Sequence, residues 1–273
     1  MAIDFLIIGG GPAGIAAAIQ AARLGLSTTL IEKDRLGGQA NAAPWIENYP
    51  GFPEGITGKE LMTYFERQLK KWPVKVIFDD AKDIESYDAK SVLLAVGLTP
   101  KLAGIPGEIP YGDPDRIDHS GKDVLVIGGG DSAFDLAWSF AKKARGVTIG
   151  MRGGTPRALP KLVDRAISRN VRIMSLRATA KQSSEIATAS TRPRNDFFKG
   201  FDLIISCIGK EASHPLLEKT KKAPGLFLAG DICHSADRHI AIAVGDGVAA
   251  AQSAYRFLNQ PQRHGDTEKY KKI

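Results

Sequence analysis

Apolar residues in this chain gather in short runs that alternate with glycine-rich turns and helical stretches. Residues 3–8 form a continuous apolar run ending in glycines, which is typical of a buried parallel strand. The alanine-rich stretch 13–25 follows and predicts a helix that ends near its glycine. A second apolar run at 27–32 completes a strand–helix–strand unit, which predicts a parallel sheet covered by helices.

The same order of elements returns later in the chain. Residues 123–127 and 146–150 predict two more strands, and 132–144 between them predicts a helix. The duplicated unit predicts an α/β fold with two Rossmann-like, three-layer dinucleotide-binding domains, the second inserted into the first.

Two weakly patterned stretches separate the predicted domains. Residues 100–122 contain three prolines with Asp and Gly, and 209–225 is the candidate return linker. The first domain is therefore expected at 1–111 and 213–273, and the inserted domain at 112–212. The remaining predicted elements are an amphipathic helix at 57–71, strands at 74–78, 91–96, 203–209 and 226–229, and a helix at about 240–258.

The first glycine loop has the pattern Gly9-x-Gly11-x-x-Gly14 between a strand and a helix. In such a loop the first glycine allows a tight turn, the second lets a pyrophosphate touch the backbone, and the third lets the helix pack closely. Glu32 ends the following strand, where an acid accepts hydrogen bonds from ribose hydroxyls. These features predict a dinucleotide site. The alternative is a glycine-rich turn without a ligand.

A second glycine loop begins at Gly128 and has alanine at its third motif position. The strand after it ends at Met151 without an acid, which disfavours NAD. Arg152 and Arg157 follow and are expected to bind the 2′-phosphate of NADP(H). The alternative is that both arginines are solvated loop charges. Two dinucleotide loops in one chain predict hydride transfer between a nicotinamide and a flavin.

Several further motifs accompany the two loops at defined spacings. They are GGQ at 37–39, ENYPGFPEGITG at 47–58, AVG at 95–97, IPGE at 105–108, GGGDSA at 128–133, AGD at 229–231 and RHIAIAVGDG at 238–247. With these motifs the chain resembles the low-molecular-weight thioredoxin reductases over most of its length.

The resemblance implies the positions of both cofactors. Gln39 and Asn48 are expected near the flavin ring, and Asp231 at the ribityl chain. The start of the last helix is expected at the pyrimidine edge, where its positive end suits a reduced flavin. The implied FAD contacts are Gly9, Gly11, Pro12, Ala13, Gly14, Glu32, Lys33, Gly38, Gln39, Asn48, Ala95, Gly97, Asp231, His239 and Ile240. The implied NADP contacts are Gly128, Gly130, Asp131, Ser132, Ala133, Arg152 and Arg157.

The chain departs from this family in its cysteines. Thioredoxin reductases carry a Cys-x-x-Cys pair before the second glycine loop, and the corresponding stretch here, EIPYGDPDRIDHSGK, has none. The two cysteines are Cys207 and Cys233. The family's arginine motif is also reduced, and the segments at about 80–90 and 178–200 are expected to be shortened.

Other candidate chemistry lies near the end of the chain. Cys233 follows Asp231 closely, so its thiolate could contact the flavin or attack a disulfide. The alternative is a buried, inert thiol. His234 and His239 could relay protons, or occupy backbone-contact or surface positions. No group of residues has the spacing of metal ligands.

Charge is concentrated in one part of the chain. The net charge of +7 comes from 37 basic and 30 acidic residues, and nine of the basic residues with a single acid lie in 141–172. This basic window has no aromatic interleaving and no nucleic-acid module, so nucleic acid is disfavoured. A dinucleotide phosphate or an acidic electron carrier fits it better.

Composition bears on whether the chain spans a membrane and on its redox compartment. No apolar run approaches the ~20 residues of a membrane span. Two cysteines make no disulfide framework, which predicts a reduced, cytoplasmic protein.

The sequence therefore predicts an FAD-dependent oxidoreductase, and the resemblance implies a homodimer. Electrons would pass from NAD(P)H through flavin to a non-dithiol acceptor such as ferredoxin, flavodoxin, a quinone, a small disulfide or oxygen. Two alternatives stay open: a flavoprotein reduced by a protein donor instead of NAD(P)H, and a non-catalytic FAD-binding module.

Overall fold

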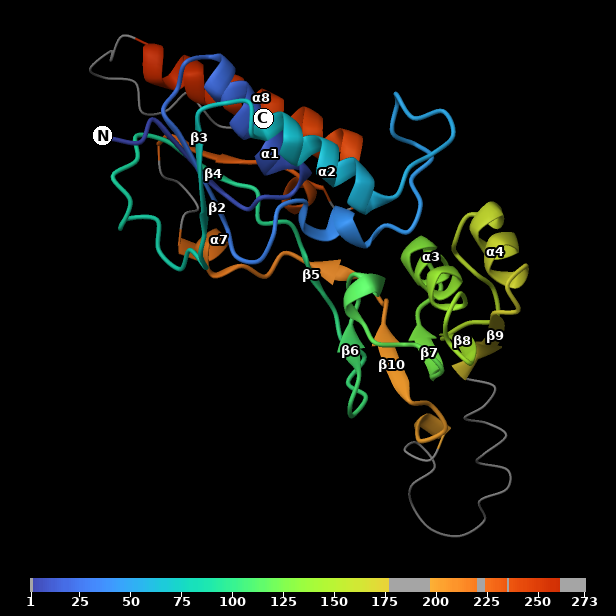
Figure 1. Ribbon diagram of the computed structural model, residues 1–273. Helices are drawn as coiled ribbons and strands as arrows, with labels where there is room; N and C mark the ends of the chain where they lie inside the picture. Colours follow the sequence, from blue (N-terminus) through green and yellow to red (C-terminus); the bar gives the residue numbers. More distant parts are fainter. Residues whose placement is uncertain (1, 177–196, 220–223, 235, 261–273) are drawn as a thin grey trace. The chain divides into compact units, whose positions relative to one another are not determined.

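The computed structural model describes residues 2–176, 197–219, 224–234 and 236–260. The chain divides into two compact units (Figure 1). Unit 1 comprises residues 1–36, 65–96 and 215–273, and unit 2 comprises 37–64 and 97–214.

Unit 1 is built on a five-stranded parallel sheet with the strand order β12-β4-β1-β2-β3. All four residues of β1 are buried, as expected for a strand covered on both faces. The strands are β1 (Phe5–Ile8), β2 (Thr28–Glu32), β3 (Val74–Phe78), β4 (Val92–Leu94) and β12 (Leu226–Leu228).

Two helices lie side by side on one face of this sheet, α1 (Pro12–Arg23) and α8 (Ile240–Asn259) (Figure 1). Small residues permit the close approach, because a Cβ added at Gly247 would collide with the carbonyl oxygen of Ala13. Helix α2 (Gly58–Leu69) contributes Leu69 to the same core. Residues 81–89 and α7 (Pro215–Lys219) cover the opposite face.

Unit 2 is built on a second five-stranded parallel sheet with the order β6-β10-β7-β8-β9. Helices α3 (Asp131–Phe140) and α4 (Pro160–Ile167) pack on one face and bury Phe134 and Phe140 completely. Phe197, Phe198 and Phe201 pack on the other face. The strands are β6 (Ile109–Pro110), β7 (Asp123–Ile127), β8 (Gly146–Met151), β9 (Arg172–Ser175) and β10 (Leu203–Ser206).

The predicted linkers contain more structure than their sequences suggest. Strand β5 (Thr99–Pro100) pairs antiparallel with β11 (Lys210–Glu211), so the two connections are hydrogen-bonded to each other. The first connection also contains β6 and a short 3-10 helix, η2 (Pro114–Arg116). Two further 3-10 helices are η1 (Gly38–Ala42) and η3 (Asp231–Cys233).

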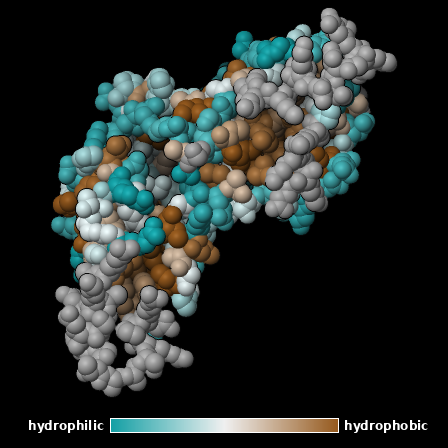
Figure 2. Space-filling model, turned by 180° about the vertical axis from the view of Figure 1, so that it is seen from behind, coloured by the Kyte–Doolittle hydropathy of each residue, from teal (hydrophilic) through white to brown (hydrophobic). Residues whose placement is uncertain are grey.

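Large hydrophobic side chains reach the surface of both units (Figure 2). In unit 1 they include Phe78, Leu228, Val248 and Tyr255. Among the described helices, none combines the length and apolar composition needed to cross a bilayer.

The predicted fold class is confirmed, with parallel sheets and helices in both units. The helix expected at 132–144 ends earlier, at Phe140, where the chain turns before β8. Most of the expected short segment at 178–200 lies outside the described residues. The domain boundaries proposed from the sequence stay a prediction.

Candidate functional site

The first glycine loop is closed tightly against its neighbours at the carboxyl end of β1. Gly9 has φ +104°, and its N–H donates to the carbonyl of Ile31 at 2.8 Å. A Cβ there would collide with the carbonyl oxygen of Ala95, and a Cβ at Gly14 with that of Gly9. Both positions therefore require glycine, one for the turn and one for helix packing.

Gly11 has the opposite surroundings. A Cβ added there meets no atom within 4 Å, so the loop opens onto free space at this residue. Helix α1 begins with Pro12 directly after it, with no side-chain cap and no acid in the first turn. The first N–H groups of α1 are thus left for an anionic acceptor, and the loop fits a pyrophosphate.

Glu32 lies beside this loop at the end of β2. Its side chain is 8% exposed, with Oε2 accepting from the Gly10 N–H at 2.6 Å and Oε1 from the Asp34 N–H at 3.0 Å. Each carboxylate oxygen can accept a further hydrogen bond, so the group suits a ribose diol. The adjacent Lys33 is exposed.

The strand order brings three loops to one edge of the unit 1 sheet. Ala95 follows β4 and donates its N–H to Ile8 at 2.8 Å, beside the glycine loop. Asp231 follows β12, after Gly230 with φ +82°. Helix α8 begins after His239 without a side-chain cap, so its positive end is available to a ligand.

Four of the predicted FAD residues belong to unit 2. The Gln39 side-chain amide donates to the Leu98 carbonyl, and both Gln39 and Asn48 are exposed. Gly38 opens η1, and Gly97 has φ +63°. These four residues are described within unit 2, and their contact with flavin stays a prediction.

The second glycine loop repeats the construction of the first. Gly128 has φ +152°, its N–H donates to Gly150 at 3.0 Å, and an added Cβ would collide with the Cys207 carbonyl oxygen. A Cβ at Gly130 meets nothing within 4 Å. Helix α3 begins after it without a side-chain cap, but unlike α1 it has an acid in its first turn, Asp131, which accepts a hydrogen bond from the Leu159 N–H. This loop therefore fits a second pyrophosphate.

The two loops differ at the end of the second strand of each unit. A Cβ on Gly10 would lie 3.1 Å from the Glu32 carboxylate, whereas a Cβ on Gly129 would lie 3.2 Å from the Met151 sulfur. A thioether takes the place of the acid, so this site has no carboxylate for a ribose diol. That difference favours a ribose carrying a 2′-phosphate.

Residues after β8 return to the second loop. The Arg157 N–H donates to the Gly129 carbonyl at 2.7 Å, and the Leu159 N–H donates to Asp131 at 2.9 Å. Arg157 is thus held next to the loop, and Arg152, directly after the strand, is exposed. In the first turn of α3, Ser132 is exposed and Ala133 is buried.

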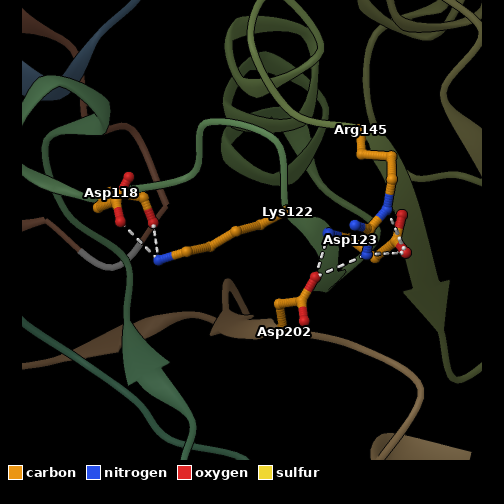
Figure 3. Close-up of polar contacts among 5 residues, drawn as sticks. All are labelled: Asp118, Lys122, Asp123, Arg145 and Asp202. Carbon is orange, nitrogen blue, oxygen red and sulfur yellow. Dashed lines mark hydrogen bonds and ion pairs between the residues drawn. The ribbon is translucent and has the colours of Figure 1, made fainter.

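Several charges of the basic window are already paired within unit 2. Arg145 contacts Asp123 at 2.7 Å and Asp202 at 2.9 Å (Figure 3), and its hydrogen bond holds the pKa of Asp123 below its usual range. Lys161 and Arg165 each contact Glu47 at 2.8 Å. These contacts were not visible in the sequence pattern.

Of the six other cations in the window, two lie over an aromatic ring and two follow strand β8 near the second loop. Arg169 and Lys142 lie over Trp138, 4.4 and 4.8 Å from its centroid. Arg152 and Arg157 make no ion pair with any described residue, so they are the cations next to the second loop that an added phosphate can meet.

The cysteines are poorly suited to thiol chemistry. Burial raises the pKa of the Cys207 thiol to about 12. Burial and the charge of Asp246 raise the pKa of Cys233 to about 11. Because the thiolate is the nucleophile, these raised pKa values lower the thiolate fraction of both cysteines near neutral pH, although Cys233 is exposed. No group of three described His, Cys, Asp or Glu residues could hold a metal ion.

Comparison with known proteins agrees with this geometry. Residues 3–255 match the family described as pyridine nucleotide-disulphide oxidoreductase. The chain belongs to the pyridine nucleotide-disulphide oxidoreductase family. The thioredoxin reductase of Bacillus subtilis is 30% identical over 303 residues, covering 95% of this chain and 96% of that protein. That of Helicobacter pylori is 31% identical over 311 residues, covering 94% and 99%.

Solved structures of thioredoxin reductases also match the fold of this oxidoreductase. Lactococcus lactis thioredoxin reductase in its FR conformation matches with a TM-score of 0.76 at 27% identity, covering 94% of this chain and 99% of that chain. The T. acidophilum thioredoxin reductase matches with a TM-score of 0.72 at 25% identity, covering 93% and 97%. The protein is thus a thioredoxin reductase-like flavoprotein, and FAD and NADP(H) are the family's cofactors, as the sequence predicted.

Proposed function

We propose that this protein is an FAD-dependent NAD(P)H oxidoreductase that passes electrons to an acceptor without a dithiol relay. The observation that carries the proposal is the pair of glycine loops, each closed at its first glycine and open at its second. One loop has a carboxylate beside it and the other has Met151 with two nearby arginines. This difference supports FAD at the first loop and NADP(H) at the second.

The residues of unit 1 would hold and orient the flavin nucleotide. The N–H groups that open α1 would bind the pyrophosphate, Glu32 would accept from the ribose, and Asp231 would contact the ribityl chain. The uncapped start of α8 would stabilise negative charge on the reduced ring. Bound FAD supplies the hydride and electron chemistry.

The proposed acceptor is not a dithiol. The chain has two cysteines, Cys207 in unit 2 and Cys233 in unit 1, and burial keeps the pKa of each thiol high. Ferredoxin, flavodoxin, a quinone, a small disulfide and oxygen are the candidate acceptors. A protein donor in place of NAD(P)H, or a non-catalytic flavin module, is the alternative.

The double variant Cys207→Ser/Cys233→Ser tests the absence of a thiol relay. We expect its rate of NADPH-dependent ferricyanide reduction to stay within about twofold of wild type, because neither thiol carries electrons. Neither protein should reduce thioredoxin with NADPH. If the folded double variant loses about tenfold or more of the ferricyanide rate while keeping its FAD, a thiol takes part and this proposal is wrong.

Arg152→Ala and Arg157→Ala test the assignment of NADP(H). Each loses a charged hydrogen bond to the 2′-phosphate, so we expect the KM for NADPH to rise about tenfold or more. The KM for NADH and the FAD content should not change. Arg169→Ala, which removes a cation of the same window that lies over Trp138, is the matched control. An equal effect on NADH, or an equal effect of the control, would contradict the assignment.

Charged and apolar side chains on the surface suggest two kinds of protein partner. An acidic electron carrier is proposed to meet the cations of unit 2 that remain outside the Glu47 and Asp123 pairs. Homodimer formation is proposed for unit 1, whose helix α8 exposes Val248 and Tyr255. A cytoplasmic location stays a prediction.

A further inference from the structure

One carboxylate oxygen in unit 1 holds both ends of the turn that contains Asp231. Oδ2 of Asp246 accepts the Gly230 N–H at 3.0 Å and the His234 Nε2–H at 2.8 Å. Gly230 and His234 flank η3, which runs from Asp231 to Cys233. The short helix is therefore fastened at both sides to a single side chain.

Asp246 also connects this turn to a second element. It lies on α8, in the part of the helix that follows its start at Ile240. The turn and the helix start are the two places after β12 where contacts with FAD are proposed. Asp246 thus links the turn and the helix through its side-chain hydrogen bonds.

Besides these two bonds to Asp246, Ile232 of the turn packs against the core, and the turn has two hydrogen bonds of its own. Its internal hydrogen bonds run from the Cys233 N–H to Gly230 at 2.9 Å and from the His234 N–H to Asp231 at 3.2 Å. A single 3-10 turn has weak intrinsic stability. The side chains of His234 and Asp246 are only 30% and 27% exposed, so their hydrogen bond is partly shielded from water.

At Gly230 the backbone packs closely against helix α1. Its φ of +82° favours glycine, and an added Cβ would lie 3.1 Å from the Cβ of Ala13 on α1. The chain is thus pressed against α1 on one side and tied to α8 on the other.

We propose that Asp246 is a positioning residue for the FAD site and that His234 acts through it. Asp246 fixes the Asp231 carboxylate against the start of α8, and His234 orients the Asp246 carboxylate. This inference rests on the proposed function to the extent that unit 1 binds FAD. It concerns affinity for the nucleotide and does not depend on the electron donor or acceptor.

The first test measures the Kd for FAD, by titrating ligand-free protein and following flavin fluorescence. Asp246→Ala should raise the Kd on the order of tenfold or more, because two hydrogen bonds are lost. His234→Ala should raise it less, by about three- to tenfold, because only one is lost. The double variant should match Asp246→Ala alone, because His234 acts only through Asp246.

Conservative variants separate positioning from general damage. His234→Gln keeps a side-chain N–H donor and Asp246→Asn keeps an oxygen acceptor, so each should restore most of the affinity lost by its alanine variant. Asp237→Ala removes an exposed acid from the connection between η3 and α8 and is the matched control, with no expected change. If Asp246→Ala fails to fold, the Kd values of His234→Ala and His234→Gln for FAD test the inference in its place. Equal Kd values for these two variants would overturn it.

The second test needs no FAD. In ligand-free protein, amide hydrogen exchange of a peptide covering residues 230–234 should be faster in Asp246→Ala and unchanged in Asp237→Ala. Additive effects of the two alanine variants on Kd, or unchanged exchange and affinity in Asp246→Ala, overturn the inference. Wild-type protein that binds no FAD overturns it together with the proposed function. FAD binding without reduction by NADPH overturns only the proposed electron donor.

Discussion

Gly11→Val is expected to abolish FAD binding while leaving the ligand-free protein folded. The added side chain enters free space, because a Cβ at this position meets no protein atom within 4 Å. That space is where the pyrophosphate would approach the start of α1, so the Kd for FAD should rise by at least about 100-fold. The measurement is flavin retained per protein chain, beside the thermal unfolding midpoint of the ligand-free form.

Two outcomes would contradict this expectation. Full FAD content in Gly11→Val would mean that the nucleotide does not cross this loop. A large loss of ligand-free stability would mean that the space is not open. Gly9→Ala gives the contrast, because its Cβ would collide with the Ala95 carbonyl oxygen and unfold the loop even without FAD.

Gly130→Val is expected to separate the two cofactors. This residue is also open, with no atom within 4 Å of an added Cβ. A side chain there would block the nicotinamide nucleotide, so flavin reduction by NADPH should slow by at least about 100-fold at equal concentration. FAD content should remain at the wild-type level, and Gly11→Val and Gly130→Val thus serve as controls for each other.

Two results would contradict the prediction for Gly130→Val. If Gly130→Val keeps the wild-type rate of reduction by NADPH, the nucleotide binds elsewhere or electrons arrive by another route. If the variant loses FAD as well, the two loops are not independent sites.

The strands and glycine loops could be predicted because their signals are local. A strand buried on both faces, such as β1, must be a continuous apolar run, and it is recognisable without its partners. Gly9 and Gly128 hold backbone conformations that favour glycine, so the loops carry their own signature. Glu32 and Met151 follow from the same register, because each ends the strand after its loop.

Contacts between distant residues could not be predicted in this way. Glu47 meets Lys161 and Arg165 across more than a hundred positions of the chain, and nothing in the local sequence marks the pairing. Asp246 could not be predicted either. In the sequence it is an ordinary polar position of a helix, and its hydrogen bond from the Gly230 N–H is seen only in the folded chain. For this reason the basic window suggested more available charge than the folded chain offers.

The central claim is that NADPH reduces the bound flavin directly. Anaerobic stopped-flow absorbance tests it most directly, with the FAD-loaded protein mixed against excess NADPH, NADH and reduced ferredoxin in separate experiments. We predict that NADPH bleaches the oxidised flavin band fastest, and that the double cysteine variant bleaches at the same rate. An oxidised flavin band that survives both nicotinamide nucleotides and is bleached by reduced ferredoxin alone would contradict the claim.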